Sequence, residues 1–257
     1  MKNLTLTIII LTLISCNHSN SGNTEKLKKD SVILKADTLI ANNYLLTIEK
    51  ADSFKRTDIF GDLDHRIKLT KNIDNSFDEA VIIQKYLSEK FGDYFHTTDT
   101  TLVLKLATGN IISFPFCDEK HETGYYFENY FKNIDYYLLK VMWDEGYCWM
   151  LVNRKNGYKI EIKGLPYISL DNQKIIAINS DLEAGYGFNG IELYSIMRDS
   201  LKLEFSRETA WGPKDSKWLS ANKLLLKKEF FHVDSITGVQ NNIYEFKSVT
   251  LDKMNSR

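Results

Sequence analysis

The sequence has almost no excess charge of either sign, because 33 basic and 34 acidic residues leave a net charge of −1. A nucleic-acid-binding surface needs clustered Lys and Arg to displace phosphate counterions, so nucleic acid is not expected as a partner. Common catalytic signatures are missing too: there is no Ser nucleophile elbow, no Walker loop and no H-E-x-x-H motif. No cofactor and no metal site are therefore expected, and the sequence leans away from an enzyme.

Long hydrophobic runs are scarce, and the clearest lies at the N-terminus, where Leu4–Ile14 follows Lys2. A membrane-spanning helix needs about 20 apolar residues, so this run is too short to cross a bilayer but suits an export signal. The residues that end it, Leu13-Ile14-Ser15-Cys16, resemble the lipobox of bacterial lipoproteins. The resemblance implies that residues 1–16 are a signal peptide and that Cys16 carries a diacylglycerol as the first mature residue. Further acyl chains, such as palmitate, would make the anchor stable. The alternative is an ordinary secretory signal with a chance cysteine.

The segment after Cys16 contains hardly any apolar residue. Residues 17–30 are polar, which is typical of a flexible tether. Asn17 rather than Asp follows the cysteine, and by the enterobacterial sorting rule this implies an outer-membrane lipoprotein. No acidic cluster follows Cys16, which favours the periplasmic side. The sequence thus predicts a cell-envelope protein held to the outer membrane by its N-terminal lipid.

Only three cysteines occur, so Cys117 and Cys148 are the two that remain after Cys16. In an oxidising periplasm these two could form a disulfide. They lie in different strand units, and two separate core thiols are the other reading. No nucleophile motif surrounds either cysteine.

Residues 31–100 are predicted to be an N-terminal α+β segment. Val32-Ile33-Leu34 and Tyr44–Ile48 indicate a hairpin that turns at Asn42-Asn43. An amphipathic helix is expected over residues 77–91, opened by a capping box and closed at a glycine (Ser76 with Glu79; Gly92).

The polar region of residues 51–74 is expected to be a solvated loop. Its acidic residues, counted from Asp58, invite a calcium-loop reading. An EF-hand needs Gly at position six and Glu at position twelve, and those positions hold Leu63 and Leu69.

Residues 101–257 are predicted to be a β-repeat domain. A strand–turn–strand pattern appears in residues 146–162 and again in residues 190–205, with weaker copies at 101–114 and 218–246. A period of about 40–50 residues with several short strands per unit is typical of a propeller-like array. The sequence therefore predicts a mostly β fold of about four or five antiparallel blades.

The segment between the two clear copies resembles the P-x-x-S-P-D-G turn of TolB-type propeller blades. Pro166, Ser169 and Asp171 match that motif, whereas Leu170 and Asn172 replace its proline and glycine. Asn tolerates the left-handed conformation nearly as well as Gly, so the turn remains plausible. TolB-like propellers bind other envelope proteins, and the resemblance implies the same here by fold analogy alone.

Two groups of residues are candidate ligand contacts. The loop that begins at Asp181 offers two carboxylates and an aromatic ring, and a later tryptophan could expose a second ring (Asp181, Glu183, Tyr186, Trp211). The other reading of the loop is a plain hairpin connection, and Trp211 and Trp218 are expected to be packing anchors. The aromatic stretch 122–132 could line a groove, but core packing is expected.

The favoured function is a binding or scaffold module of the cell envelope with an envelope protein as partner. The alternative is a carbohydrate-active or other hydrolytic enzyme that uses Asp181 and Glu183. A sensor or inhibitor of an envelope enzyme fits the sequence equally well. The oligomeric state is left open.

Overall fold

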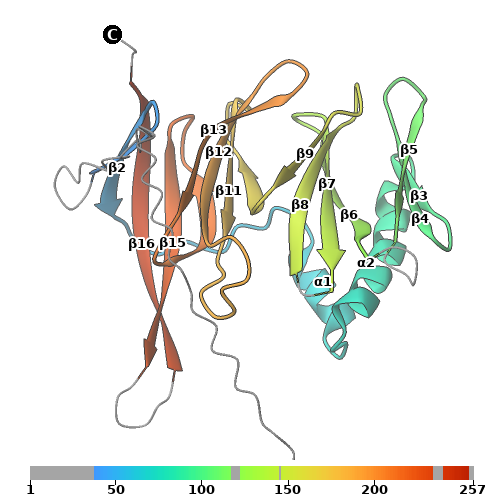
Figure 1. Ribbon diagram of the computed structural model, residues 1–257, viewed down its shortest axis with the longest axis horizontal. Coiled ribbons are helices and arrows are strands. Elements are labelled where there is room, and N and C mark those ends of the chain that lie inside the picture. Colours follow the sequence, from blue (N-terminus) through green and yellow to red (C-terminus); the bar gives the residue numbers. More distant parts are fainter. Residues whose placement is uncertain (1–37, 117–121, 145, 234–239, 255–257) are drawn as a thin grey trace, which may run out of the picture. The chain divides into compact units, whose positions relative to one another are not determined.

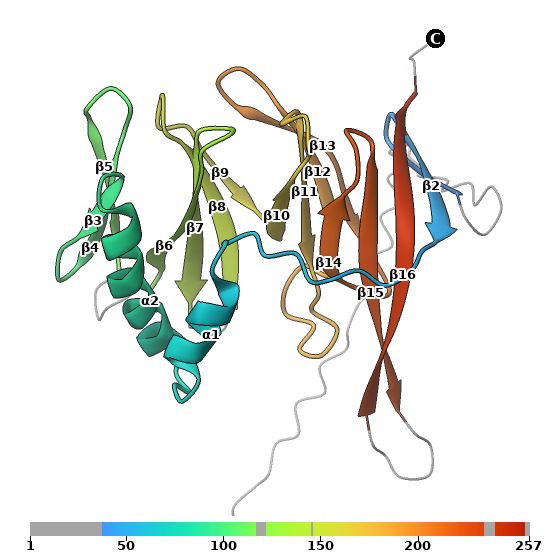
Figure 2. The ribbon, with the colours of Figure 1, turned by 180° about the vertical axis from the view of Figure 1, so that it is seen from behind.

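The computed structural model describes residues 38–116, 122–144, 146–233 and 240–254. The predictions for residues 1–34, Cys16 among them, and for Cys117 lie outside these ranges. All described residues belong to one compact unit. They form strands in four antiparallel sheets and two helices (Figures 1 and 2), which confirms the predicted mostly β, blade-like fold.

Three of the sheets are built from strands that follow one another in the chain. The first has the order β3-β4-β5 (Phe95–Thr97, Thr101–Lys105, Ile111–Pro115). The second has the order β6-β7-β8-β9 (Gly124–Phe131, Tyr136–Trp143, Gly146–Asn153, Lys159–Ile162). The third has the order β10-β11-β12-β13 (Leu165–Ile168, Lys174–Asn179, Gly190–Ile196, Leu201–Glu208).

The fourth sheet joins the two ends of the described chain. Its order is β1-β2-β16-β15-β14 (Thr38–Ala41, Tyr44–Lys50, Gln240–Lys253, Lys223–Val233, Gly212–Trp218). β1 and β2 turn at Asn42-Asn43 as predicted, and Asn42 has a left-handed φ of 53°. Two strands of the predicted 31–100 segment therefore complete a sheet of the predicted repeat domain.

The two clear copies of the repeat occupy equivalent places in successive sheets. Strands β8 and β9 are the third and fourth strands of one sheet, and β12 and β13 are those of the next. The turn that resembles TolB blades joins β10 to β11, and Asn172 has a φ of 57° there, the left-handed geometry expected of it. Ser169 Oγ contacts Asp171 Oδ1 at 2.6 Å and accepts from the Lys174 N–H at 2.9 Å, which fixes the turn.

The central strands are mostly hydrophobic because both faces of their sheet are covered. In β7, Tyr137 and Leu139 pack toward β3–β5 and α2, whereas Tyr136 and Leu138 pack toward β10–β13. Side chains alternate between the two faces of a strand, so a run that is apolar on both faces needs a packing partner on each side. A third cluster joins the third sheet to the fourth and contains Trp218, which confirms its predicted packing role.

Two helices cover one end of the array, and neither is long and apolar enough to cross a membrane in the part of the chain described. Helix α2 (Ser76–Phe91) confirms the predicted helix. The predicted capping box is wrong: Asn75, not Ser76, accepts from the N–H groups of Phe77 and Asp78. Gly92 follows in a right-handed conformation with φ −59°.

Helix α1 (Leu63–Thr70) replaces part of the loop expected over residues 51–74. Just before it, Asp58 accepts from the N–H groups of Phe60, Gly61 and Leu63, the first helical residue, at 2.8–3.1 Å. The Asp58 carboxylate thus caps backbone donors that would otherwise lack partners.

The free edge of β6 is closed by side chains rather than by another strand. Gln84 of α2 accepts from the Phe127 N–H at 2.9 Å and donates to the Phe127 carbonyl at 2.7 Å. An exposed edge invites pairing with another chain, so this amide removes that hazard while tying α2 to the sheet. The stretch 122–132 is mainly core, as expected, with Tyr126 and Phe127 at 2% and 0% exposure.

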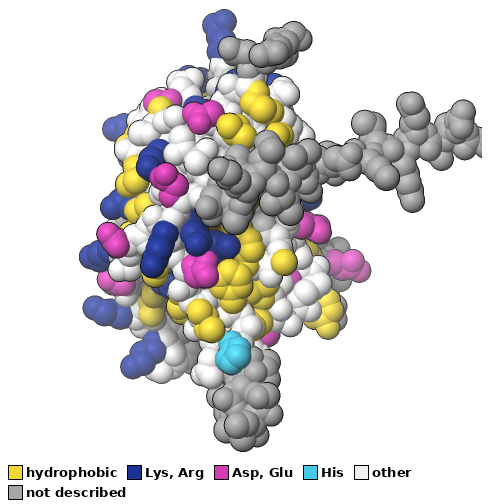
Figure 3. Space-filling model, turned by 90° about the vertical axis from the view of Figure 1, so that its left-hand side faces the viewer, with side chains coloured by type: hydrophobic (Ala, Val, Ile, Leu, Met, Phe, Trp, Pro, Cys, Tyr) yellow, Lys and Arg dark blue, Asp and Glu magenta, His cyan; other side chains and the backbone are white. Residues whose placement is uncertain are grey.

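The outer face of the fourth sheet carries several lysines. Leu224 and Leu226 of β15 face the neighbouring sheet, so Lys223 and Lys227 lie on the opposite side. Lys223 pairs with Glu49 at 3.6 Å, and the Lys227 ammonium lies 3.8 Å from the centroid of a tyrosine ring. Figure 3, viewed from this side, shows Lys and Arg side chains interspersed with Asp, Glu and hydrophobic side chains. Such charges oppose stacking of a further sheet.

Candidate functional site

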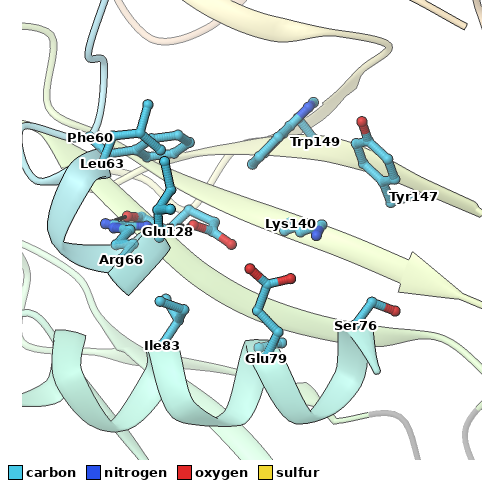
Figure 4. Close-up of a pocket in the computed structure, with 12 residues that line it drawn as sticks. Phe60, Leu63, Arg66, Ser76, Glu79, Ile83, Glu128, Lys140, Tyr147 and Trp149 are labelled. Carbon is cyan, nitrogen blue, oxygen red and sulfur yellow. Dashed lines mark hydrogen bonds and ion pairs between the residues drawn. The ribbon is translucent and has the colours of Figure 1, made fainter. Parts of the chain in front are cut away.

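Helices α1 and α2 leave a cavity of about 260 Å³ against strands β6, β7 and β8 (Figure 4). Its lining mixes ionisable and aromatic side chains from five elements and the segment before α1 (Phe60, Leu63, Arg66, Ile67, Ser76, Glu79, Ala80, Ile83, Glu128, Lys140, Tyr147, Trp149). We call this the helix cavity. A concave site with a few convergent polar groups among apolar walls is typical of small-molecule binding.

Arg66 lies at the bottom of the helix cavity, where hydrogen bonds hold its guanidinium in place. Its Nε donates to Asp62 at 2.6 Å, Nη1 to the Glu128 carboxylate at 2.7 Å, and Nη2 to the Glu128 carbonyl at 2.8 Å. Its guanidinium carbon also lies 4.6 Å from the centroid of the Phe60 ring. Burial raises the pKa of Asp62, but contacts from Lys90 and Arg66 outweigh it and leave that pKa lowered.

Two carboxylates face the helix cavity from different elements. Glu128 comes from β6, is 9% exposed, and has its pKa raised by burial, against the attraction of Arg66 and Lys140. Glu79 comes from the first turn of α2 and accepts from the Thr70 hydroxyl at 3.1 Å. The charge of Glu79 also raises the pKa of Glu128.

The opposite wall is formed by Lys140, Trp149 and Tyr147. The Lys140 ammonium lies 5.1 Å from the centroid of the Tyr147 ring, and the Tyr147 and Trp149 rings meet edge to face at 6.0 Å. Trp149 is 8% exposed, whereas Tyr147 is 51% exposed at the mouth. Figure 4 shows Lys140 pointing between these rings and the two carboxylates.

A second cavity of about 530 Å³ adjoins the first at Tyr147, which lines both. Its lining comes from the β7–β8 turn and from the loop that begins at Asp181 (Trp143, Gly146, Tyr147, Asn179, Ser180, Asp181, Ala184, Tyr186, Gly187). We call this the loop cavity. Trp143 and Tyr186 expose 40% and 84% of their surfaces beside it.

The four residues predicted to contact a ligand lie at different sites in the structure. Asp181 and Tyr186 meet at the loop cavity, but Glu183 is an exposed residue outside its lining. Trp211 lies elsewhere, against the core between the third and fourth sheets, with the Lys228 ammonium 4.4 Å from its ring centroid. The structure therefore does not bring the four residues together.

Asp181 organises its own loop. Its Oδ1 accepts from the Gly185 N–H at 3.1 Å, its Oδ2 accepts from the Gly187 N–H, and its own N–H donates to Asn189 at 3.0 Å. Each oxygen of this carboxylate therefore accepts one backbone hydrogen bond, and these bonds fix the shape of the loop.

Cys148 lies half-buried in β8, where burial raises the pKa of its thiol to about 11. Its predicted disulfide partner Cys117 is outside the described ranges, so the pairing stays a prediction. No group of three or more His, Cys, Asp or Glu side chains is placed to hold a metal ion within the described ranges.

Sequence reasoning missed the ionisable residues of the helix cavity, because they come from four separate elements. A signal was nevertheless present in two of them. Glu128 interrupts the aromatic stretch 122–132, and Lys140 interrupts the apolar run of β7. A charge inside a strand that is otherwise core must reach a partner or a cavity, since an unpaired buried charge is costly.

Comparison with known proteins gives little further information. No family model matches the chain, and no curated protein matches it. Among solved structures, one described as "a putative 6-phosphogluconolactonase from Bacteroides uniformis ATCC 8492" aligns with 10% identity over 60% of this chain and 73% of that chain. The TM-score is 0.25, too low for the likeness to support a conclusion about fold or activity.

Proposed function

We propose that the chain is a lipid-anchored protein of the outer membrane that faces the periplasm and binds an envelope protein through the loops of its blade-like domain. The observation that carries this proposal is the group of exposed aromatic residues at the loop cavity, Trp143, Tyr147 and Tyr186. Aromatic side chains supply much of the binding energy of protein interfaces, because they cover a large area at a small cost in rotamer entropy.

The loop behind these rings is held in place before any partner arrives. Asp181 ties both Gly185 and Gly187, and Asn179 Nδ2 donates to the Phe188 carbonyl at 2.7 Å. Ordering a loop during association costs free energy, so a loop already fixed binds more tightly with the same contacts.

The lipobox at Cys16 and the turn at Ser169–Asn172 support the envelope part of the proposal by resemblance. An anchor that confines the protein to one membrane surface raises the effective concentration of a partner on that surface. The proposal therefore predicts that both the anchor and the aromatic group are needed for capture.

A cross-linked pull-down from native membranes tests this prediction. Four forms are compared: wild type, Cys16→Ala, Tyr186→Ala and Leu170→Ala. Leu170 is a matched control, because it is 65% exposed on a different turn. The expected result is one envelope protein captured by wild type and Leu170→Ala, and lost in Cys16→Ala and Tyr186→Ala. Equal capture by Tyr186→Ala and wild type would place the interface elsewhere.

The hydrolytic alternative has less support, because Glu183 lies outside the lining of the loop cavity and Asp181 already accepts two backbone hydrogen bonds from its own loop. Replacing Glu183 tests it more cleanly than replacing Asp181, since Glu183 is exposed and makes none of these contacts. An enzyme that relied on Glu183 would lose turnover in Glu183→Gln with unchanged thermal stability.

A further inference from the structure

The helix cavity presents three ionisable groups that described residues leave free to bind a ligand. Arg66 engages Oε2 of Glu128 and leaves Oε1 without a hydrogen bond from any described residue. Thr70 donates to Oε1 of Glu79, and Oε2 of Glu79 has no hydrogen bond from any described residue. Lys140 makes neither a hydrogen bond nor an ion pair with a residue in the described ranges. Figure 4 shows Glu79, Glu128 and Lys140 pointing into the same space.

The charges around this space balance. Arg66 and Lys140 oppose Glu79 and Glu128, and all four line the cavity. A phosphorylated or carboxylate ligand would meet two carboxylates there, and a cation would meet an arginine and a lysine. Like charges at close range in a partly desolvated site repel strongly, so the lining favours a ligand without net charge.

The free groups also specify the ligand's polar atoms. Carboxylates only accept hydrogen bonds and an ammonium only donates them, so one ligand must both donate and accept within a short distance. Hydroxyl groups do both. Phe60 and Trp149, with ring centroids 6.3 Å apart, supply an aromatic wall on which the C–H face of a saturated ring can pack.

The size of the cavity limits the ligand to one ring. About 260 Å³ lies just below the range of about 300–1,000 Å³ that is typical of ligand pockets. The cavity adjoins the loop cavity at Tyr147, so further rings of a longer ligand would extend there.

We propose that the helix cavity binds a single neutral sugar unit, with Glu79 and Glu128 accepting from its hydroxyls, Lys140 donating to a ring or hydroxyl oxygen, and Trp149 packing on its face. This site shares Tyr147 with the aromatic group at the loop cavity, but the proposal does not depend on partner capture.

Isothermal titration of the full chain tests the proposal. The probes are D-glucose, D-galactose, D-mannose and N-acetyl-D-glucosamine, with glucose 6-phosphate and L-phenylalanine as anionic and zwitterionic comparisons. The variants are Lys140→Met and Glu79→Gln, and the matched control is Lys217→Met, an exposed lysine of β14. Melting temperatures show whether each variant remains folded, and Glu79 on the partly exposed side of α2 is a second route if Lys140→Met does not fold.

The expected result is a neutral sugar that binds with a dissociation constant of about 1 mM or lower and loses at least about tenfold in affinity in Lys140→Met and Glu79→Gln, but not in Lys217→Met. Three results would overturn the proposal: no probe sugar binding below about 10 mM, equal affinity in wild type and the cavity variants, or tighter binding of the charged comparison probes.

Discussion

Arg66→Met removes the guanidinium from the base of the helix cavity while keeping most of the side-chain volume. The guanidinium makes three hydrogen bonds of 2.6–2.8 Å to Asp62 and Glu128, and its side chain is 7% exposed. Losing one partner of a buried pair leaves the other as an uncompensated buried charge. We therefore expect the free energy of unfolding to fall by about 3–5 kcal/mol at pH 8.

The loss should depend on pH, because Glu128 can avoid the penalty by taking up a proton. Burial already raises the pKa of Glu128 against the attraction of Arg66, so removing Arg66 raises this pKa further. The folded state then binds more protons than the unfolded chain, in which a Glu pKa is about 4.3. Stability falls as pH rises through the window between these two values, so the variant should lose less at pH 5 than at pH 8.

Urea unfolding of wild type and Arg66→Met, followed by far-UV circular dichroism at pH 5 and pH 8, measures both effects. Arg198→Met is the control, because the Arg198 side chain is 95% exposed and should change little at either pH. A loss at pH 8 no larger than that of an exposed ion pair, about 1 kcal/mol, would refute the reasoning. So would an equal loss at the two pH values.

Three further predictions follow from contacts elsewhere. Gln84→Ala leaves the buried N–H and C=O of Phe127 without partners and should lower the free energy of unfolding by at least about 2 kcal/mol in urea titration; an unchanged midpoint would mean that water replaces the amide. Gly164→Ala would put a Cβ 2.4 Å from the backbone of Ile178 and should cost about 1–3 kcal/mol in the same assay, and a neutral result would show that the backbone shifts freely. Cys148, with a thiol pKa of about 11, should react with iodoacetamide at pH 8 at least tenfold more slowly in the folded chain than in urea, as mapped by mass spectrometry; equal rates would contradict the burial argument.

The blade-like fold was predictable because its signals are local. Short stretches of sequence indicate where the strands, turns and buried faces lie. Examples are the apolar run of β7 and the two repeat copies at β8–β9 and β12–β13. Asn172 shows how far such reasoning extends, since its left-handed geometry was expected from its place in the turn motif, where it replaces a glycine. Helix α2 was found from its buried face in the same way.

Helix α1 was missed because it is only eight residues long and its buried side chains, Arg66 and Thr70, are not a periodic apolar face. It has few buried side chains, and what holds it is the contact of Arg66 with Glu128, 62 residues away. The helix cavity was missed for the same reason: Glu79, Glu128 and Lys140 meet only after α2, β6 and β7 have packed. Long-range pairing of charges leaves no periodic trace in the chain.

The pairing of β2 with β16 has a consequence for the order of folding. Glu49 and Ser248, 199 residues apart, lie side by side in that ladder, so the fourth sheet cannot close until nearly the whole chain is present. Contacts of such sequence separation carry a large loop-closure entropy and slow the folding of β proteins. Until then Tyr44 and Leu46, which end up 2% and 5% exposed, lack the strand that covers them. A chain truncated before β16 would keep this apolar edge exposed. We expect such a chain to aggregate rather than to fold with a reduced free energy of unfolding.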